Sequence, residues 1–91
     1  MTIRIEHTVQ VWREDASYVA RAIPLDVLSC GTTPEDARRN ISEAVALFLK
    51  TASAQGTLAE VLEECGYRRV NDEWRAPTLL SSETVSQAIS A

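Results

Sequence analysis

The sequence contains no apolar run near the roughly 18 residues of a membrane helix, and its first residues lack the apolar stretch of a secretory signal. It also contains no internal repeat and no low-complexity tract. The 91 residues suffice for one small domain, and a hydrophobic fraction of 45% is normal for a globular protein. We therefore expect a single folded domain in the cytoplasm.

Metal-ligating and reactive residue types are scarce. The chain has two cysteines, Cys30 and Cys65, one histidine, His7, and no CxxC or Cys/His cluster. We therefore expect no zinc site and no cofactor. A disulfide is improbable in a reducing compartment, and both thiols are expected to be small core residues. His7 falls in the inward-facing series of its strand, and we interpret it as structural rather than as a catalytic base.

Basic residues are outnumbered by acidic ones. Nine lysines and arginines stand against 13 acidic residues, which gives a formal net charge of −4. A free-standing nucleic-acid binder normally presents a basic surface. The balance instead suits a partner that is itself basic, because complementary charge steers association. Arg38 and Arg39 form a basic pair on a predicted helix, and we expect them to be solvated rather than to contact RNA.

Alternating apolar side chains predict the first strands. Residues 3–12 alternate with period two, which is typical of a strand with one buried face. A polar connection over 13–17 leads to a second strand over 18–22. Pro24 ends it, because proline has no amide to donate to a ladder, and a short third strand is expected over 27–30. These segments predict an antiparallel meander.

The clearest element is a long helix. Thr33 is a good N-cap residue, Pro34 suits the first helical position, and Gly56 ends the helix. One side of the helix carries an apolar stripe that is expected to dock on the meander. The stripe consists of Ala37, Ile41, Ala44, Val45 and Phe48.

A second, shorter helix is predicted after Gly56. Thr57 and Glu60 have the spacing of a capping box. Gly66 is expected to be left-handed after the last turn, with Tyr67 folded back on the helix. The helix is therefore expected to lie between these residues.

Residues 67–75 predict a β-hairpin that turns at Asn71 and Asp72. In a two-residue turn Arg69 lies opposite Trp74, which allows a cation–π contact. The sequence therefore predicts one tryptophan in the meander, Trp12, and one in the hairpin, Trp74.

The predicted order is β-β-β-α-α-β-β followed by a tail, which is an α+β arrangement. We place the domain at residues 1–75 and the tail at 76–91. The apolar pattern of the tail fits either a helix or a strand. Because the sheet edges of so small a meander tend to be covered or paired, we expect a homodimer or higher oligomer, and the tail is a candidate for pairing with another subunit or partner.

A combination of features in the meander and the long helix is typical of one family. An aromatic strand ends near a proline, a short strand ends in a Ser-x-Gly step, and a helix follows with an acidic first turn, an alanine and an Asn-x-x-Glu-Ala core. With this combination, residues 3–67 resemble the HicB-type antitoxin family. The residues that carry the pattern are Tyr18, Pro24, Ser29, Gly31, Glu35, Ala37, Asn40, Glu43 and Ala44.

This resemblance implies a truncated ribonuclease-H-like fold without nuclease activity. It also implies a partner, a HicA-type mRNA interferase toxin, small and basic, whose active site the antitoxin would cover. Many members carry a C-terminal DNA-binding segment, but residues 76–91 contain no basic residue and are too short for one. We therefore expect no direct nucleic-acid binding. The alternative is an orphan binding or oligomerisation module of the same fold without a toxin.

Two tryptophans are the most tempting binding residues. Tryptophan dominates binding hot spots but is also ordinary core filling. A metal-dependent nuclease would need several converging carboxylates, and only Glu6 and Asp26 lie near strands, so we expect no catalytic residue. The candidates for partner binding are Trp12, Arg69, Asp72, Glu73 and Trp74.

Overall fold

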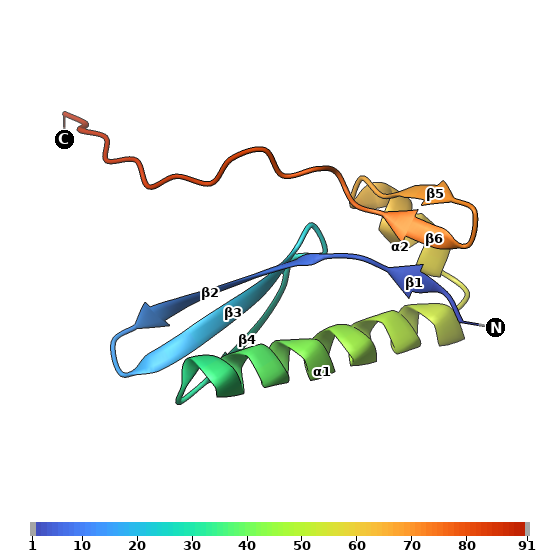
Figure 1. The fold of residues 1–91 in the computed structure, drawn as a ribbon, viewed down its shortest axis with the longest axis horizontal. Helices are drawn as coiled ribbons and strands as arrows, with labels where there is room; N and C mark the ends of the chain where they lie inside the picture. The colour runs from blue at the N-terminus through green and yellow to red at the C-terminus, as the bar shows by residue number, and fades with distance from the viewer. Residues whose placement is uncertain (1, 91) are drawn as a thin grey trace.

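The computed structural model describes residues 2–90, with a three-stranded meander packed on a long helix (Figure 1). Strands β2 (Thr8–Glu14), β3 (Ser17–Ile23) and β4 (Val27–Gly31) form an antiparallel sheet in the order β2-β3-β4. Helix α1 (Pro34–Ala54) runs across one face of this sheet. The predicted α+β class, with a β-β-β-α meander and helix, is confirmed.

A second small sheet lies at the far end of α1 (Figure 1). Strands β1 (Arg4–Ile5), β5 (Arg68–Val70) and β6 (Glu73–Arg75) pair in the order β1-β6-β5. Strands β5 and β6 form the predicted hairpin, while β1 pairs with β6 in parallel. Helix α2 (Leu58–Glu64) lies beside this hairpin. The hairpin prediction is confirmed, and its parallel partner strand was not predicted.

The prediction of one continuous strand over residues 3–12 is wrong. The chain leaves the second sheet at Ile5 and enters the meander at Thr8, so Glu6 and His7 connect the two sheets. Alternation of apolar residues continues through this connection. The period-two pattern shows which side chains face inward but not where a strand changes partners.

Hydrogen bonds to Glu6 explain why the first strand is interrupted there. Its amide donates to the carbonyl oxygen of Trp74 at 3.3 Å, and its side-chain carboxylate accepts from the amide of Ala76 at 3.2 Å. The hydroxyl of Tyr67 donates to the carbonyl oxygen of Glu6. These groups come from residues more than 60 positions away in the sequence. Long-range contacts of this kind leave no local pattern.

The core is built around small side chains. Ala20 and Ala22 on β3 and Ala37 on α1 have no exposed surface. Alanines on facing surfaces let the helix lie close to the sheet, since packed interiors leave few voids. Ile41 and Leu62 are the largest fully buried side chains. The predicted α1 stripe is confirmed, with Ala44 and Phe48 half-buried at its margins.

Helix α1 ends in a Schellman motif around Gly56. The amide of Gly56 donates to the carbonyl oxygen of Ser53 at 3.1 Å, and the amide of Thr57 donates to that of Ala52 at 2.9 Å. Gly56 has a φ of +72°, in the left-handed region that favours glycine. The predicted capping box at Thr57 is wrong, because its hydroxyl bonds the Ala52 carbonyl at 3.3 Å and makes no cap bond to α2.

Helix α2 ends in the same way at Gly66, as predicted. The amides of Gly66 and Tyr67 donate to the carbonyl oxygens of Glu63 and Leu62, each at 3.0 Å. Tyr67 and Leu62 belong to the same buried cluster. This turn therefore carries the chain from α2 directly into the β5–β6 hairpin.

Regular structure ends at Arg75, and residues 76–90 form neither the helix nor the strand considered for the tail. They run on the side of the meander opposite α1 (Figure 1). Ala91 lies outside the described residues. Among residues 2–90, neither helix has the length and apolarity that crossing a membrane requires.

Candidate functional site

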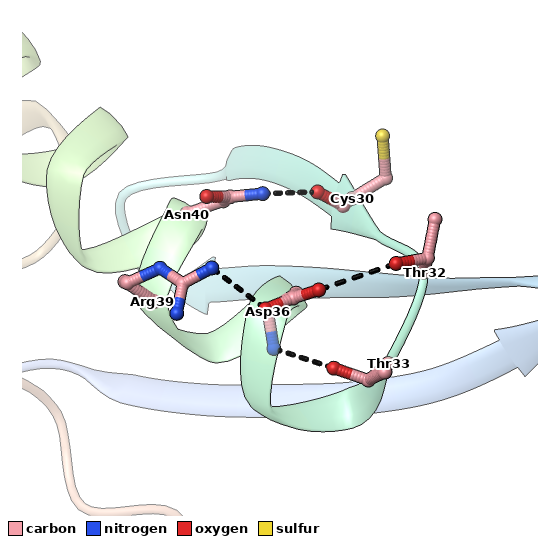
Figure 2. A network of polar contacts seen from close by, with 6 residues as sticks. All are labelled: Cys30, Thr32, Thr33, Asp36, Arg39 and Asn40. Atoms are coloured by element: carbon pink, nitrogen blue, oxygen red, sulfur yellow. Dashed lines mark hydrogen bonds and ion pairs between the residues drawn. The ribbon is translucent and has the colours of Figure 1, made fainter.

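Two residues of the family pattern, Gly31 and Asn40, lie where β4 turns into α1, and Figure 2 shows Asn40 at this junction. The side-chain amide of Asn40 donates to the carbonyl oxygen of Cys30 at 2.8 Å, which ties the second turn of the helix to the strand before it. At Gly31 an added Cβ would lie 2.6 Å from the backbone nitrogen of Ala37. The glycine is therefore required because the helix backbone approaches the strand too closely for any side chain.

A second set of polar contacts fixes the first turn of α1 (Figure 2). The Thr33 hydroxyl accepts a hydrogen bond from the amide of Asp36 at 3.0 Å, which is the predicted N-cap. The Asp36 carboxylate accepts from the Thr32 hydroxyl at 3.2 Å and from Arg39 at 2.6 Å. The hydrogen bond from Thr32 lowers the pKa of Asp36, and Arg39 lowers it further. Asp36 is therefore a negatively charged residue in the first turn of α1, where it interacts favourably with the helix dipole.

The other residues of the family pattern also have structural positions. Tyr18 packs against the core from β3, and Ala44 is half-buried on α1. Pro24 lies in the turn between β3 and β4, and Glu35 and Glu43 are exposed on the solvent side of α1. The remaining members, Ser29 and Ala37, lie on the facing surfaces of β4 and α1. The pattern therefore describes how a helix docks on a meander.

The β5–β6 hairpin carries four of the five binding candidates. Trp74 is only 5% exposed and belongs to the core, so a partner can reach it only through the residues that cover it. The Arg69 guanidinium lies 5.8 Å from the centre of the Trp74 ring, which confirms the predicted cation–π contact. Glu73 pairs with Arg75 at 2.9 Å, whereas Asp72 is exposed in the turn.

Helix α2 lies at the same end of the molecule as the hairpin (Figure 1) and carries several acidic residues. Glu60, Glu63 and Glu64 are all exposed, and no ion pair holds any of them among residues 2–90. These glutamates are not among the binding candidates predicted from the sequence. Their spacing of three and four on a short amphipathic helix was the available signal.

Trp12 lies on a different surface, the face of the meander that α1 does not cover. Its strand partner is Val19, and Val19 pairs in turn with Cys30, so all three point to that face. Trp12 is 39% exposed. We call this surface the outer face of the meander. It consists of Thr8, Gln10, Trp12, Glu14, Ser17, Val19, Arg21, Ile23, Leu28 and Cys30.

The cysteines and the histidine differ in part from expectation. Cys30 is exposed, not a core residue, because it follows the outward series of β4. Cys65 is half-buried against the core, and both thiols are free. His7 lies between the two sheets, where its Nδ1 atom is buried without a hydrogen-bond partner.

The carboxylates nearest the strands do not converge. Asp26 pairs with Arg21 of the meander at 2.9 Å, and Glu6 pairs with Arg75 of the second sheet at 3.6 Å, so the two carboxylates belong to different sheets. Within residues 2–90, no group of three His, Cys, Asp or Glu side chains is placed to hold a metal ion. Burial, together with the charges of Cys65 and Glu6, raises the pKa of Tyr67 to about 12.

Comparison with protein-family models, with curated proteins and with solved structures finds no match for this chain.

Proposed function

We propose that this chain is a cytoplasmic antitoxin of the HicB type, which binds a small basic RNA-cleaving toxin of the HicA type and covers its active site. It acts by binding and not as an enzyme. The observation that carries the proposal is the β4–α1 junction. There Gly31 and Asn40, two residues of the family pattern, make the contacts that dock the helix. The relation to a truncated ribonuclease-H-like fold belongs to the same proposal.

Charge supports a basic partner. Besides the net charge of −4, the three α2 glutamates and Asp72 are exposed at one end of the molecule with no ion pair among residues 2–90. Unpaired surface charges of one sign raise the association rate with an oppositely charged protein. We place the toxin-binding surface at this end, with Arg69 and Glu73 at its edge.

Self-association is the second part of the proposal. The meander leaves the edges of β2 and β4 without a strand partner among residues 2–90, and the outer face is not covered by a helix. Such surfaces tend to be paired or covered. They also favour the alternative function, an orphan oligomerisation module without a toxin, since self-association needs no second protein.

The test is neutralisation in cells. The small basic protein encoded beside this chain is induced alone or with the chain, and survival is counted. We expect rescue by the chain, and reduced rescue when Glu60, Glu63 and Glu64 are all changed to Gln. The matched control changes the exposed Glu35 and Glu43 of α1 to Gln and is expected to rescue fully. Failure of the unchanged chain to protect the cells would sink the antitoxin proposal.

A further inference from the structure

The outer face of the meander is an apolar surface without a cover. Helix α1 occupies only the opposite face of the sheet (Figure 1). On the outer face Trp12, Leu28 and Cys30 are exposed, and Leu28 reaches 59%. Large apolar side chains that share one uncovered sheet face mark an interaction site more often than scattered ones do.

The tail is a second apolar surface without a cover. Leu80 is 91% exposed and Ile89 is 88% exposed, and Leu79 and Val85 are also exposed. Residues 76–79 share a hollow with Thr8, Ile23 and Pro24, at one end of the outer face. From there the tail runs on the same side of the meander as the outer face (Figure 1). Both uncovered surfaces therefore face the same space.

The two surfaces together approach the size of one stable interface. Three strands spaced about 4.8 Å apart, the longest about 24 Å long, present only ~350 Å² per copy. A stable protein interface buries about 800 Å² on each partner, so the face alone is too small. An extended tail spans about 40 Å over residues 79–90, which adds an area of the same order.

The charged side chains of the outer face indicate which kind of partner covers it. Two charged side chains belong to the outer face: Arg21, whose guanidinium is held by Asp26 at 2.9 Å, and Glu14, which lies at the end of β2 beside the turn to β3. A basic toxin would find one acidic side chain on this face without an ion pair among residues 2–90, Glu14 at its edge, whereas α2 and Asp72 together offer four. A nearly neutral apolar surface is instead complementary to itself, as a two-fold symmetric interface requires.

We propose that a second copy of this chain covers the outer face. The two outer faces pack on each other about a two-fold axis, and each tail lies along the partner copy. The self-association proposed above would then occur through the outer face, and it does not require the toxin. It assigns Trp12 to the interface between copies and leaves the α2 end of each copy free for a different protein.

The test uses the purified full-length chain alone, with its mass measured by light scattering over a dilution series. We expect a dimer of twice the 10.0 kDa chain mass. Trp12→Ser and Leu28→Ser should each raise the dissociation constant about tenfold or more, because each removes a buried apolar side chain. A double change of Leu80 and Ile89 to Ser should do the same. The control is Leu47→Ser, on the solvent side of α1 and 67% exposed, which should leave the constant unchanged.

Alkylation of Cys30 locates the interface independently of any substitution. We expect its labelling rate to fall as protein concentration rises through the dissociation constant, with half-buried Cys65 as the internal reference. A monomer at every concentration would overturn the proposal. So would a dimer in which Cys30 labels at a constant rate and Leu28→Ser has no effect, since another surface would then form it. Neither result bears on neutralisation of a toxin, which is measured separately.

Discussion

Asn40 and Cys30 are joined by a hydrogen bond of 2.8 Å from the asparagine amide to the cysteine carbonyl oxygen. The bond links the second turn of α1 to the last residues of β4, ten positions earlier in the chain. It fixes where the helix starts along the strand. The apolar stripe of α1 then meets the inner face of the meander in the correct register.

Removal of this bond has a predictable cost. We expect Asn40→Ala to lower the free energy of unfolding by about 1 kcal/mol, the net worth of a typical hydrogen bond. Ser42→Ala is the control, because Ser42 is exposed on the same helix and makes no side-chain hydrogen bond among residues 2–90. Urea denaturation of both variants measures the difference. Equal stability of the two variants would contradict the role given to Asn40.

Two glycines test two different reasons for requiring glycine: the close approach of the α1 backbone at Gly31 and the left-handed backbone conformation at Gly56. In Gly31→Ala the new Cβ meets the helix backbone at 2.6 Å, and we expect a loss of about 1–3 kcal/mol from overpacking. In Gly56→Ala nothing lies within 4 Å, but φ is +72°, so the loss should be about 1–2 kcal/mol from the left-handed conformation alone. Thermal unfolding compares the two. A neutral Gly31→Ala variant would show that α1 does not need this close approach.

The local signals in the sequence predicted most elements correctly, and long-range pairing explains the rest. The N-cap at Thr33, the α1 stripe and the hairpin with Arg69 over Trp74 depend on neighbours within a few residues, and all three are confirmed. The break at Glu6 depends on β6 and Tyr67, which are far away in the chain. No periodicity within residues 3–12 contains that information.

The candidate site was harder to predict than the fold. Trp74 was chosen because tryptophan is common in hot spots, but its side chain is in the core, and Cys30 was expected inside but is exposed. Residue type alone does not separate an interface from a core. The acidic side of α2 was missed because each glutamate is unremarkable alone, and only the fold brings α2 beside the hairpin (Figure 1).

Tyr67 predicts a loss of stability at alkaline pH. Its pKa is about 12 in the folded chain against 10.0 in the unfolded chain, so between these values the folded state binds more protons. Stability is therefore complete below pH 10 and falls as the pH rises towards 12. We expect a loss of about 1–2 kcal/mol over this window.

The matched variant is Tyr67→Phe, which removes the titrating group and the hydrogen bond to Glu6. It should be less stable than the unchanged chain at pH 7 but should lose less stability between pH 9 and about pH 12. Urea midpoints at the two pH values give the comparison. An identical alkaline loss in both proteins would assign the effect to other groups.

The α2 glutamates predict a salt-dependent association with the toxin. Surface charges act mainly on the association rate and are screened within about 10 Å at 0.1 M salt. The triple change of Glu60, Glu63 and Glu64 to Gln should therefore slow association at low salt and converge with the unchanged chain at high salt. Stopped-flow binding measures both conditions. A difference confined to the dissociation rate would indicate direct contacts instead of steering.

The most direct test of the central claim is RNA cleavage by the purified toxin encoded beside this chain, titrated with the purified chain. We predict that cleavage falls in proportion to added chain and stops at a fixed stoichiometric ratio, because the bound chain covers the active site. The chain alone should leave the RNA intact. Cleavage that continues unchanged in an excess of the folded chain would contradict the antitoxin account and leave the self-associating module as the better description.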